Sequence, residues 1–158
     1  MLLKDAKIMA LALMETHGLI KKGWSFEFDN SKRRFGVCKS WERIIGLSSP
    51  LTQLNSVAEV KNTILHEIAH ALVGFGHNHD RVWKAKAIEI GCDGERCFSS
   101  NEVNLPPSKY VAVCVKCERV HKREKRISVG KHASCGRCSG GKYNPTYKLE
   151  FVPNTKKL

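Results

Sequence analysis

The chain has 158 residues, of which 42% are hydrophobic, so it can bury the core of one compact domain plus a small appendage but not two full-sized domains. This composition excludes a disordered protein. No stretch is apolar over the length of a membrane span, and the N-terminal residues lack the order of regions that a signal peptide has. We therefore expect a cytoplasmic protein without membrane contact. The net charge of +12 is concentrated in residues 105–158, which contain 13 lysines and arginines but only 3 acidic residues. This concentration indicates either a polyanionic partner, of which nucleic acid is the first candidate, or a solubilising surface.

The N-terminal quarter of the chain predicts one helix and three strands. Residues 4–17 place apolar residues among charged ones, as an amphipathic helix does, and Gly18 follows as a stop signal. Apolar and polar residues alternate over 24–29, and β character resumes over 34–39 after a turn, so we expect these two strands to form a hairpin. Residues 44–47 add a third strand.

The next element is a helix with strong signals at both ends. Ser56 and Glu59 have the spacing of a capping box, and Gly74 follows the helix as a stop. Its buried stripe has a spacing of four residues and consists of Val60, Ile64, Ile68 and Leu72. A second helix is expected over 81–90, followed by a linker over 92–107.

The first of these helices carries the motif His66-Glu67-Ile68-Ala69-His70. Residues four apart lie one turn apart on the same face, so His66 and His70 can direct their imidazole nitrogens at one metal ion, and zinc suits two imidazoles with an open water position. Glu67 reaches the edge of that site, where it can take a proton from water and pass it to a leaving amine. The alternative is that both histidines are simply exposed or hydrogen-bonded, but they lie away from the apolar stripe, which favours the metal site.

A catalytic zinc needs a third protein ligand, for which His77 and His79 are both candidates. In an extended form of this zinc-binding motif, a glycine and a third histidine follow the helix at fixed positions. This sequence does not match it, because Gly74 and His77 each come one position late. His79 leads into the second helix and can fold back over the metal from there. We favour His79, partly because of the family resemblance described below.

Two cysteine pairs predict a second metal site. Cys114-x-x-Cys117 and Cys135-x-x-Cys138 each fit a tight turn, and two such turns close a tetrahedral four-cysteine site. With all four positions filled by protein, this zinc should be structural, and the β-prone segments 110–115 and 147–152 suit a zinc ribbon. The other three cysteines, Cys38, Cys92 and Cys97, are interpreted as ordinary thiols.

The ribbon also contains a basic stretch, in which the candidate nucleic-acid contacts are Lys122, Arg123, Lys125 and Arg126. These side chains can lie along a phosphate backbone, which would give salt-sensitive and sequence-independent binding to DNA. They can equally form a solvated edge that discourages strand pairing.

Together these motifs resemble the SprT-like family, which includes the Spartan-type DNA-dependent proteases. The resemblance spans about residues 1–152 and rests on His66-Glu67-x-x-His70, on His79-x-x-x-Trp83 at the start of a helix, and on the four-cysteine ribbon. It implies an α+β fold, with a minimal zincin-like domain (N-terminal helix, small sheet and metal-motif helix) over residues 1–104. A small, β-rich, basic zinc ribbon follows over residues 105–158.

The resemblance also implies the chemistry of the sites. His66, His70 and His79 would bind a catalytic zinc, Glu67 would be the catalytic residue, and the four cysteines would hold a second zinc ion. The substrates would be proteins bound or crosslinked to DNA, including single-stranded DNA. The protein would then be a nucleoid- or DNA-associated protease with a role in DNA repair. The chain departs from longer members of the family in the short segment between His70 and His79.

Two other functions compete with this interpretation. One is a zinc-ribbon nucleic-acid-binding protein whose zincin-like half is structural or vestigial, and the other is a zinc hydrolase acting on a non-peptide bond. Glu67 favours an enzyme over the first alternative, because a purely structural metal site has no need of a glutamate beside its first ligand.

Overall fold

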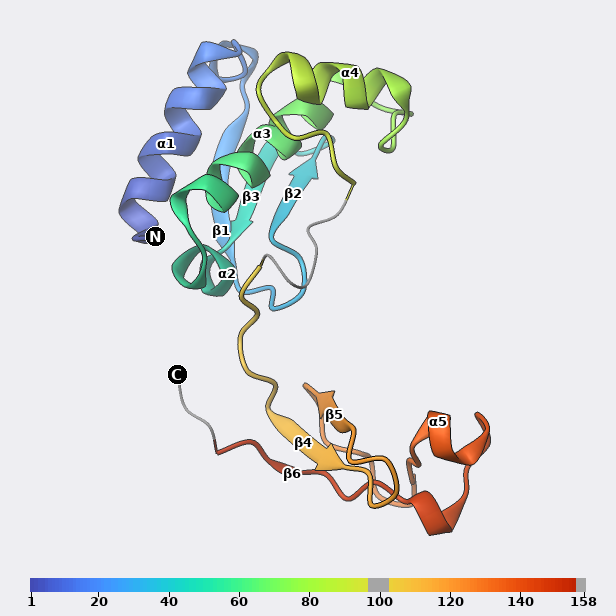
Figure 1. Cartoon of the computed structure of the whole chain (residues 1–158). Helices are drawn as coiled ribbons and strands as arrows, with labels where there is room; N and C mark the ends of the chain where they lie inside the picture. The colour runs from blue at the N-terminus through green and yellow to red at the C-terminus, as the bar shows by residue number, and fades with distance from the viewer. Residues whose placement is uncertain (97–102, 156–158) are drawn as a thin grey trace. The chain divides into compact units, whose positions relative to one another are not determined.

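The structure is a computed structural model that describes residues 1–96 and 103–155, and it divides into two compact units, Met1–Pro106 and Pro107–Leu158. The fold class is α+β, as expected (Figure 1). The first unit combines helices with a mixed sheet, and the second contains a small antiparallel sheet and a cluster of four cysteines. No helix in the described part of the chain has the length and apolar character needed to cross a membrane.

The first unit is built on a three-stranded sheet with β3 (Ile44–Ser48) in its centre. β1 (Ser25–Asp29) pairs with β3 in parallel, and β2 (Gly36–Lys39) pairs with the other side of β3 in antiparallel fashion. The expected hairpin is therefore wrong, because the first two strands do not pair with each other. The reason is burial, since Ile45 and Leu47 are completely buried and the most apolar strand takes the position with a neighbour on each edge.

Two helices cover one face of this sheet (Figure 1), namely α1 (Leu3–Thr16) and α3 (Val57–Val73). The face that α1 buries repeats every four residues and consists of Ala6, Ala10 and Met14. The two alanines are short, so α1 can lie close to its neighbours in the core. A short 3₁₀ helix, η1 (Ile20–Lys22), then leads into β1.

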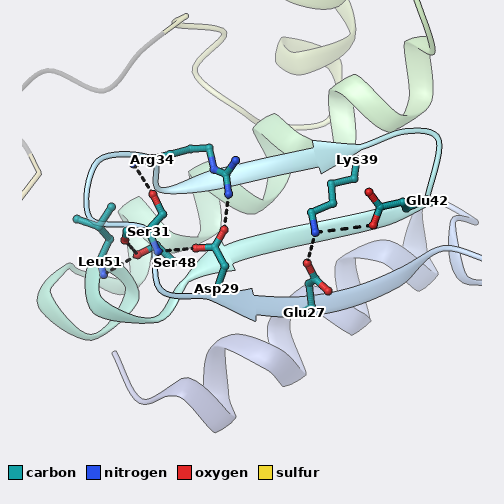
Figure 2. A network of polar contacts seen from close by, with 8 residues as sticks. All are labelled: Glu27, Asp29, Ser31, Arg34, Lys39, Glu42, Ser48 and Leu51. Carbon is teal, nitrogen blue, oxygen red and sulfur yellow. Dashed lines mark hydrogen bonds and ion pairs between the residues drawn. The ribbon is translucent and has the colours of Figure 1, made fainter.

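The opposite face of the sheet carries polar side chains (Figure 2). Lys39 Nζ lies 2.6 Å from Glu27 Oε1 and 3.8 Å from Glu42 Oε2, and Arg34 pairs with Asp29. Strand residues alternate between faces, so Glu27 points outward where Phe26 and Phe28 beside it pack against the core. Exposed ion pairs of this kind contribute about 0–1 kcal/mol each, so the helix-covered face supplies most of the stability.

The short helix α2 (Ser49–Leu54) was not expected from the sequence. Its signal is Ser48, whose hydroxyl oxygen accepts the backbone N–H of Leu51, followed by a proline in the first turn. The capping box of α3 is confirmed, since Ser56 accepts the N–H of Glu59 and the Glu59 carboxylate accepts the N–H of Ser56. This cap fixes the start of the helix that carries the histidine motif.

The last helix of the first unit is α4 (Arg81–Glu89), close to the range predicted for it. Asp80 caps it by accepting the backbone N–H of Trp83. The Trp83 side chain is only 1% exposed and packs against α3 in a cluster with Leu65 and Ala69. α4 is thereby fixed against the helix that carries the motif.

The second unit is a three-stranded antiparallel sheet in the order β5 (Val120–Arg123), β4 (Tyr110–Val113), β6 (Val152–Pro153). It also contains the short helices α5 (Gly136–Ser139) and η2 (Pro145–Tyr147). The segment 147–152 was expected to be β-prone, but only its end joins the sheet, because Lys148 and Leu149 pair instead with the turn at 133–134. The buried core is very small and consists of Ala112, Cys114, Cys135 and Leu149.

Candidate metal centres

Three histidines of the first unit converge on one point. His66 and His70 lie one turn apart on α3, and His79 reaches them from the loop before α4. The Nε2 atom of His79 lies 2.9 Å from that of His66 and 3.1 Å from that of His70. A tetrahedral zinc ion with bonds of about 2.0–2.1 Å separates its nitrogen ligands by about 3.3 Å, so this arrangement fits such an ion closely.

The protonation state of these imidazoles favours the binding of a metal cation. Burial, with a smaller contribution from neighbouring histidines, lowers the pKa of His66 and of His70 to about 4, and burial also lowers the pKa of His79. The rings are therefore neutral at pH 7 and keep the lone pairs that a metal requires. The ring of His66 donates to the carbonyl of Glu95 and that of His70 to the carbonyl of His77, as metal-bound imidazoles commonly do through their second nitrogen.

The two candidates for the third ligand differ in backbone conformation and in position. His79 has a φ of +54°, a left-handed conformation that turns its ring back toward α3. His77 lies outside the cluster, and its Nδ1 atom is 2.7 Å from the carboxylate of Asp80. The positions thus favour His79 as a ligand and give His77 a partner of its own at the start of α4.

We therefore expect the two histidines to respond differently to truncation. His79→Ala should weaken metal binding by more than the roughly 10- to 100-fold that loss of an outer-shell partner costs, because it removes a ligand. His77→Ala should change affinity little, since His70 donates to the backbone carbonyl of residue 77, which alanine keeps. Competition with a fluorescent zinc chelator measures both affinities, and the opposite ranking would transfer the role to His77.

Glu67 lies beside the three histidines without joining their cluster. It is 8% exposed and lines a cleft of about 1570 Å³ together with His66 and His70. Burial raises the pKa of Glu67 to about 8, and this rise is opposed by the charge of Arg34 and by a hydrogen bond from the backbone N–H of Cys38. A cation held by the histidines would lower the pKa of Glu67 from this raised value and favour the carboxylate.

The position of Glu67 depends on a glycine in β2. A Cβ atom at Gly36 would lie 2.6 Å from Glu67 Oε1, 2.8 Å from Glu67 Cγ and 2.8 Å from Thr63 Cγ2. All three distances are shorter than van der Waals contact. The strand therefore approaches α3 so closely that only glycine leaves the glutamate where it is.

Gly36→Ala should displace the Glu67 side chain and destabilise the first unit by about 1–3 kcal/mol, as overpacking does. Adding Thr63→Ser removes the Thr63 methyl group, one of the three clashing atoms, so the double variant should be more stable than the sum of the two single effects predicts. Urea unfolding of the wild type, both single variants and the double variant measures the coupling. Simple additivity would show that the strand moves away instead.

Trp83 forms one side of the histidine cluster. Its ring centroid lies 4.6 Å from that of His66, 5.1 Å from that of His70 and 4.5 Å from that of His79. In the sequence, Trp83 was interpreted only as part of the family motif at the start of its helix. In the structure the same side chain also packs against all three imidazoles and limits their rotation.

The four ribbon cysteines form the second cluster. Cys114 Sγ lies 3.8 Å from Cys138 Sγ, and Cys117 Sγ lies 3.7 Å from Cys135 Sγ. These separations are far longer than a disulfide bond, and they match the spacing of about 3.8 Å expected for sulfur ligands around a tetrahedral zinc with bonds of about 2.3 Å. Hydrogen bonds from the backbone N–H groups of Cys117 and Lys116 lower the pKa of Cys114 to about 6, which favours the thiolate.

The predicted basic contacts are exposed but do not share one face. Lys122 and Arg123 are consecutive in the edge strand β5, so their side chains point to opposite faces, and Lys125 and Arg126 follow the strand. The Arg123 guanidinium lies over the ring of Phe151, 5.5 Å from its centroid.

The other cysteines belong to neither cluster. Cys38 is half-buried in β2, Cys92 is buried beside α4, and Cys97 lies outside the described residues. Burial raises the pKa of Cys38 and of Cys92 to about 11, so both thiols stay protonated at pH 7. Their treatment as ordinary thiols remains a prediction.

Three contributors to the sites were not identified from the sequence. They are Gly36, the backbone N–H of Cys38, and Asp80, which both caps α4 and pairs with His77. The only available sequence signals were a glycine within a strand and an aspartate just before a helix, and neither specifies what it contacts.

Comparison with known protein families gives a match to the SprT-like family over residues 8–106. No curated protein matches the chain. The matched region contains the histidine cluster, Glu67 and the cleft, and it covers well over half of the 158 residues. The chain therefore belongs to the SprT-like family, and its first unit is a metallopeptidase-like domain.

Proposed function

We propose that the protein is a zinc-dependent peptidase that acts on DNA-associated proteins. The observation that carries this proposal is the convergence of three neutral imidazoles beside the buried side chain of Glu67 in an open cleft. A structural metal site would use four protein ligands and would leave no carboxylate facing the cleft. The three-ligand arrangement leaves a coordination position for water or substrate.

The residues divide the chemistry between them. His66, His70 and His79 would hold zinc, which supplies Lewis-acid polarisation and lowers the pKa of water. Glu67 accepts a proton from the attacking water and delivers it to the leaving amine. Trp83 and the carbonyl partners of the imidazoles keep the ligand geometry fixed during the reaction.

The edge of the sheet favours a polypeptide as the substrate, rather than another carbonyl compound. β2 is an edge strand of the first unit and lines the same cleft as Glu67. An extended peptide can add to an exposed sheet edge through main-chain hydrogen bonds, which presents successive peptide bonds to the site.

Proteolysis of an unfolded protein tests the proposal. Full-length chain loaded with zinc should cleave casein, lose this activity when phenanthroline removes the metal, and regain it on addition of zinc. Activity that is unaffected by removal of the metal would contradict the proposal. Zinc uptake without cleavage of casein, with or without DNA, would favour the alternative of a nucleic-acid-binding protein with a vestigial zincin-like half.

For the second unit we propose a zinc ribbon that binds DNA without sequence preference. Residues 105–158 carry 13 basic residues against 3 acidic ones, so the unit stays clearly basic even with four thiolates on a zinc ion. Aromatic rings lie among the cations, since Lys116 Nζ is 5.2 Å from the Tyr147 ring centroid and Arg123 lies over Phe151. Rings and cations together suit the bases and phosphates of single strands.

Neutralising the four basic residues Lys122, Arg123, Lys125 and Arg126 should weaken DNA binding and flatten its salt dependence. Each phosphate contact contributes about 0.7–0.9 to the slope of log affinity against log salt. Because Lys122 and Arg123 point to opposite faces, we expect the slope to fall by less than four contacts would give. Fluorescence anisotropy with a labelled oligonucleotide across a salt series measures it, and equal slopes would show a merely solvated edge.

A further inference from the structure

An exposed aromatic pair stands at one end of the cleft. Trp41, in the turn between β2 and β3, is 88% exposed, and Phe75, in the turn after α3, is 59% exposed. Their ring centroids lie 4.4 Å apart with the planes tilted by 39°. Two large rings from different elements are thus held together in solvent, and exposed tryptophans of this kind are typical of binding surfaces.

The pair is continuous with the site described above. Phe75 lines the cleft together with Glu67 and His70, and Ser40, which precedes Trp41, lines it as well. β2 runs from Gly36 beside Glu67 toward Trp41. The strand ends at Lys39, three positions after Gly36, and Trp41 follows five positions after Gly36, so an extended segment lying along β2 at about 3.3 Å per residue would reach the rings about three to five residues from the peptide bond at Glu67.

The charges around Trp41 favour an apolar occupant over a polyanion. Lys39 is paired with Glu27 and Glu42 (Figure 2), and the Arg43 guanidinium donates to the carbonyl of Lys22. Glu42 places a carboxylate directly after Trp41 in the chain. A phosphate backbone would meet this carboxylate and two cations that are already engaged, whereas an apolar side chain requires only the rings.

We propose that Trp41 and Phe75 form a subsite for an aromatic or large aliphatic side chain of the protein substrate, about three to five residues from the scissile bond. This inference rests on the proposed peptidase function and names its substrate class. The subsite selects unfolded segments, because a folded protein hides such side chains in its core. It thereby gives a protease with an open cleft a means of discriminating against intact surfaces.

The test measures binding without turnover, in the zinc-loaded full-length Glu67→Gln variant. The probes are fluorescein-labelled decapeptides of glycine and serine, each with one phenylalanine at a different position, and an all-serine control. At the best position we expect phenylalanine to improve the Kd by about 10- to 30-fold, as an aromatic hot spot does. Trp41→Ala and Phe75→Ala should each remove most of this gain, and Trp41→Phe should retain it.

Controls separate this subsite from general stickiness and from nucleic-acid binding. Ile8→Ala removes another exposed apolar side chain of the first unit, 66% exposed and outside the cleft lining, and should leave the phenylalanine gain intact. Peptide binding should also shift the emission of Trp41 to shorter wavelength, and this shift should be absent in Trp41→Phe. Quenching of Trp41 by an oligothymidylate in place of any peptide effect would overturn the proposal and assign the rings to nucleobases.

The outcomes also distinguish the subsite from the peptidase function. If the wild type cleaves casein but Trp41→Ala keeps the full preference for phenylalanine, the subsite is wrong and the peptidase function stands. If the preference depends on Trp41 but the wild type cleaves nothing, the subsite stands as a polypeptide-binding surface and the peptidase function is wrong.

Discussion

Replacing Glu67 with glutamine should abolish proteolysis while the metal stays in place. The amide has nearly the shape of the carboxylate, so Gly36 and Thr63 can pack against it as before. It cannot accept a proton from water, and general acid–base catalysis by a positioned side chain contributes about 10²- to 10⁴-fold to the rate. We expect kcat/KM to fall within or beyond that range, as measured on a fluorogenic unfolded substrate.

Metal analysis decides how this loss is interpreted. The zinc content of Glu67→Gln should equal that of the wild type, because the carboxylate is not among the clustered ligand atoms. His79→Ala should lose activity together with metal. A Glu67→Gln variant that kept near wild-type rates with a full zinc complement would show that another group moves the proton.

Local signals in the sequence predicted the elements that carry the sites. The capping box at Ser56 and Glu59 and the apolar stripe ending at Leu72 depend only on neighbours within the same helix, so they could be read without any tertiary information. The two CxxC turns are local for the same reason, since each turn orients its own pair of thiols.

Features that depend on contacts between distant segments could not be predicted in this way. The hairpin prediction was wrong because a turn after Asp29 does not reveal that β3 will pair with both β1 and β2. The role of Gly36 arises only when β2 meets α3 and Glu67 fills the space that a Cβ atom would need. The Trp41–Phe75 pair likewise joins two turns that are 34 positions apart in the chain.

The third ligand lies between these cases. The spacing in the sequence could not decide between His77 and His79 as the third ligand, because both follow the helix at distances that a loop can accommodate. Tertiary geometry favours His79, through its left-handed backbone and the capture of His77 by Asp80. A loop conformation of this kind is fixed by the helix that follows it, so the spacing alone could not distinguish the two histidines.

Replacing Cys114 and Cys117 with serine should unfold the second unit and leave the first intact. Two of the four residues in its described buried core, Cys114 and Cys135, belong to the four-cysteine cluster, and the other two are Ala112 and Leu149. A unit of this size buries too little apolar surface to fold alone, and structural zinc in comparable peptides contributes about 10–16 kcal/mol of apparent binding free energy. Loss of the metal therefore removes the largest stabilising term.

The expected result is the loss of one of two zinc ions and a selective collapse of amide dispersion in ¹H–¹⁵N spectra. Resonances of residues 107–155 should move to random-coil positions, whereas those of α3 and β3 should stay. Cys38→Ser is the matched control, because that thiol belongs to neither cluster and its loss should change neither the zinc count nor the spectra of the second unit. Chelation of the wild type should reproduce the collapse. A double variant that kept its second-unit dispersion would show that the ribbon folds without metal, and the four-cysteine cluster would then not be what holds it together.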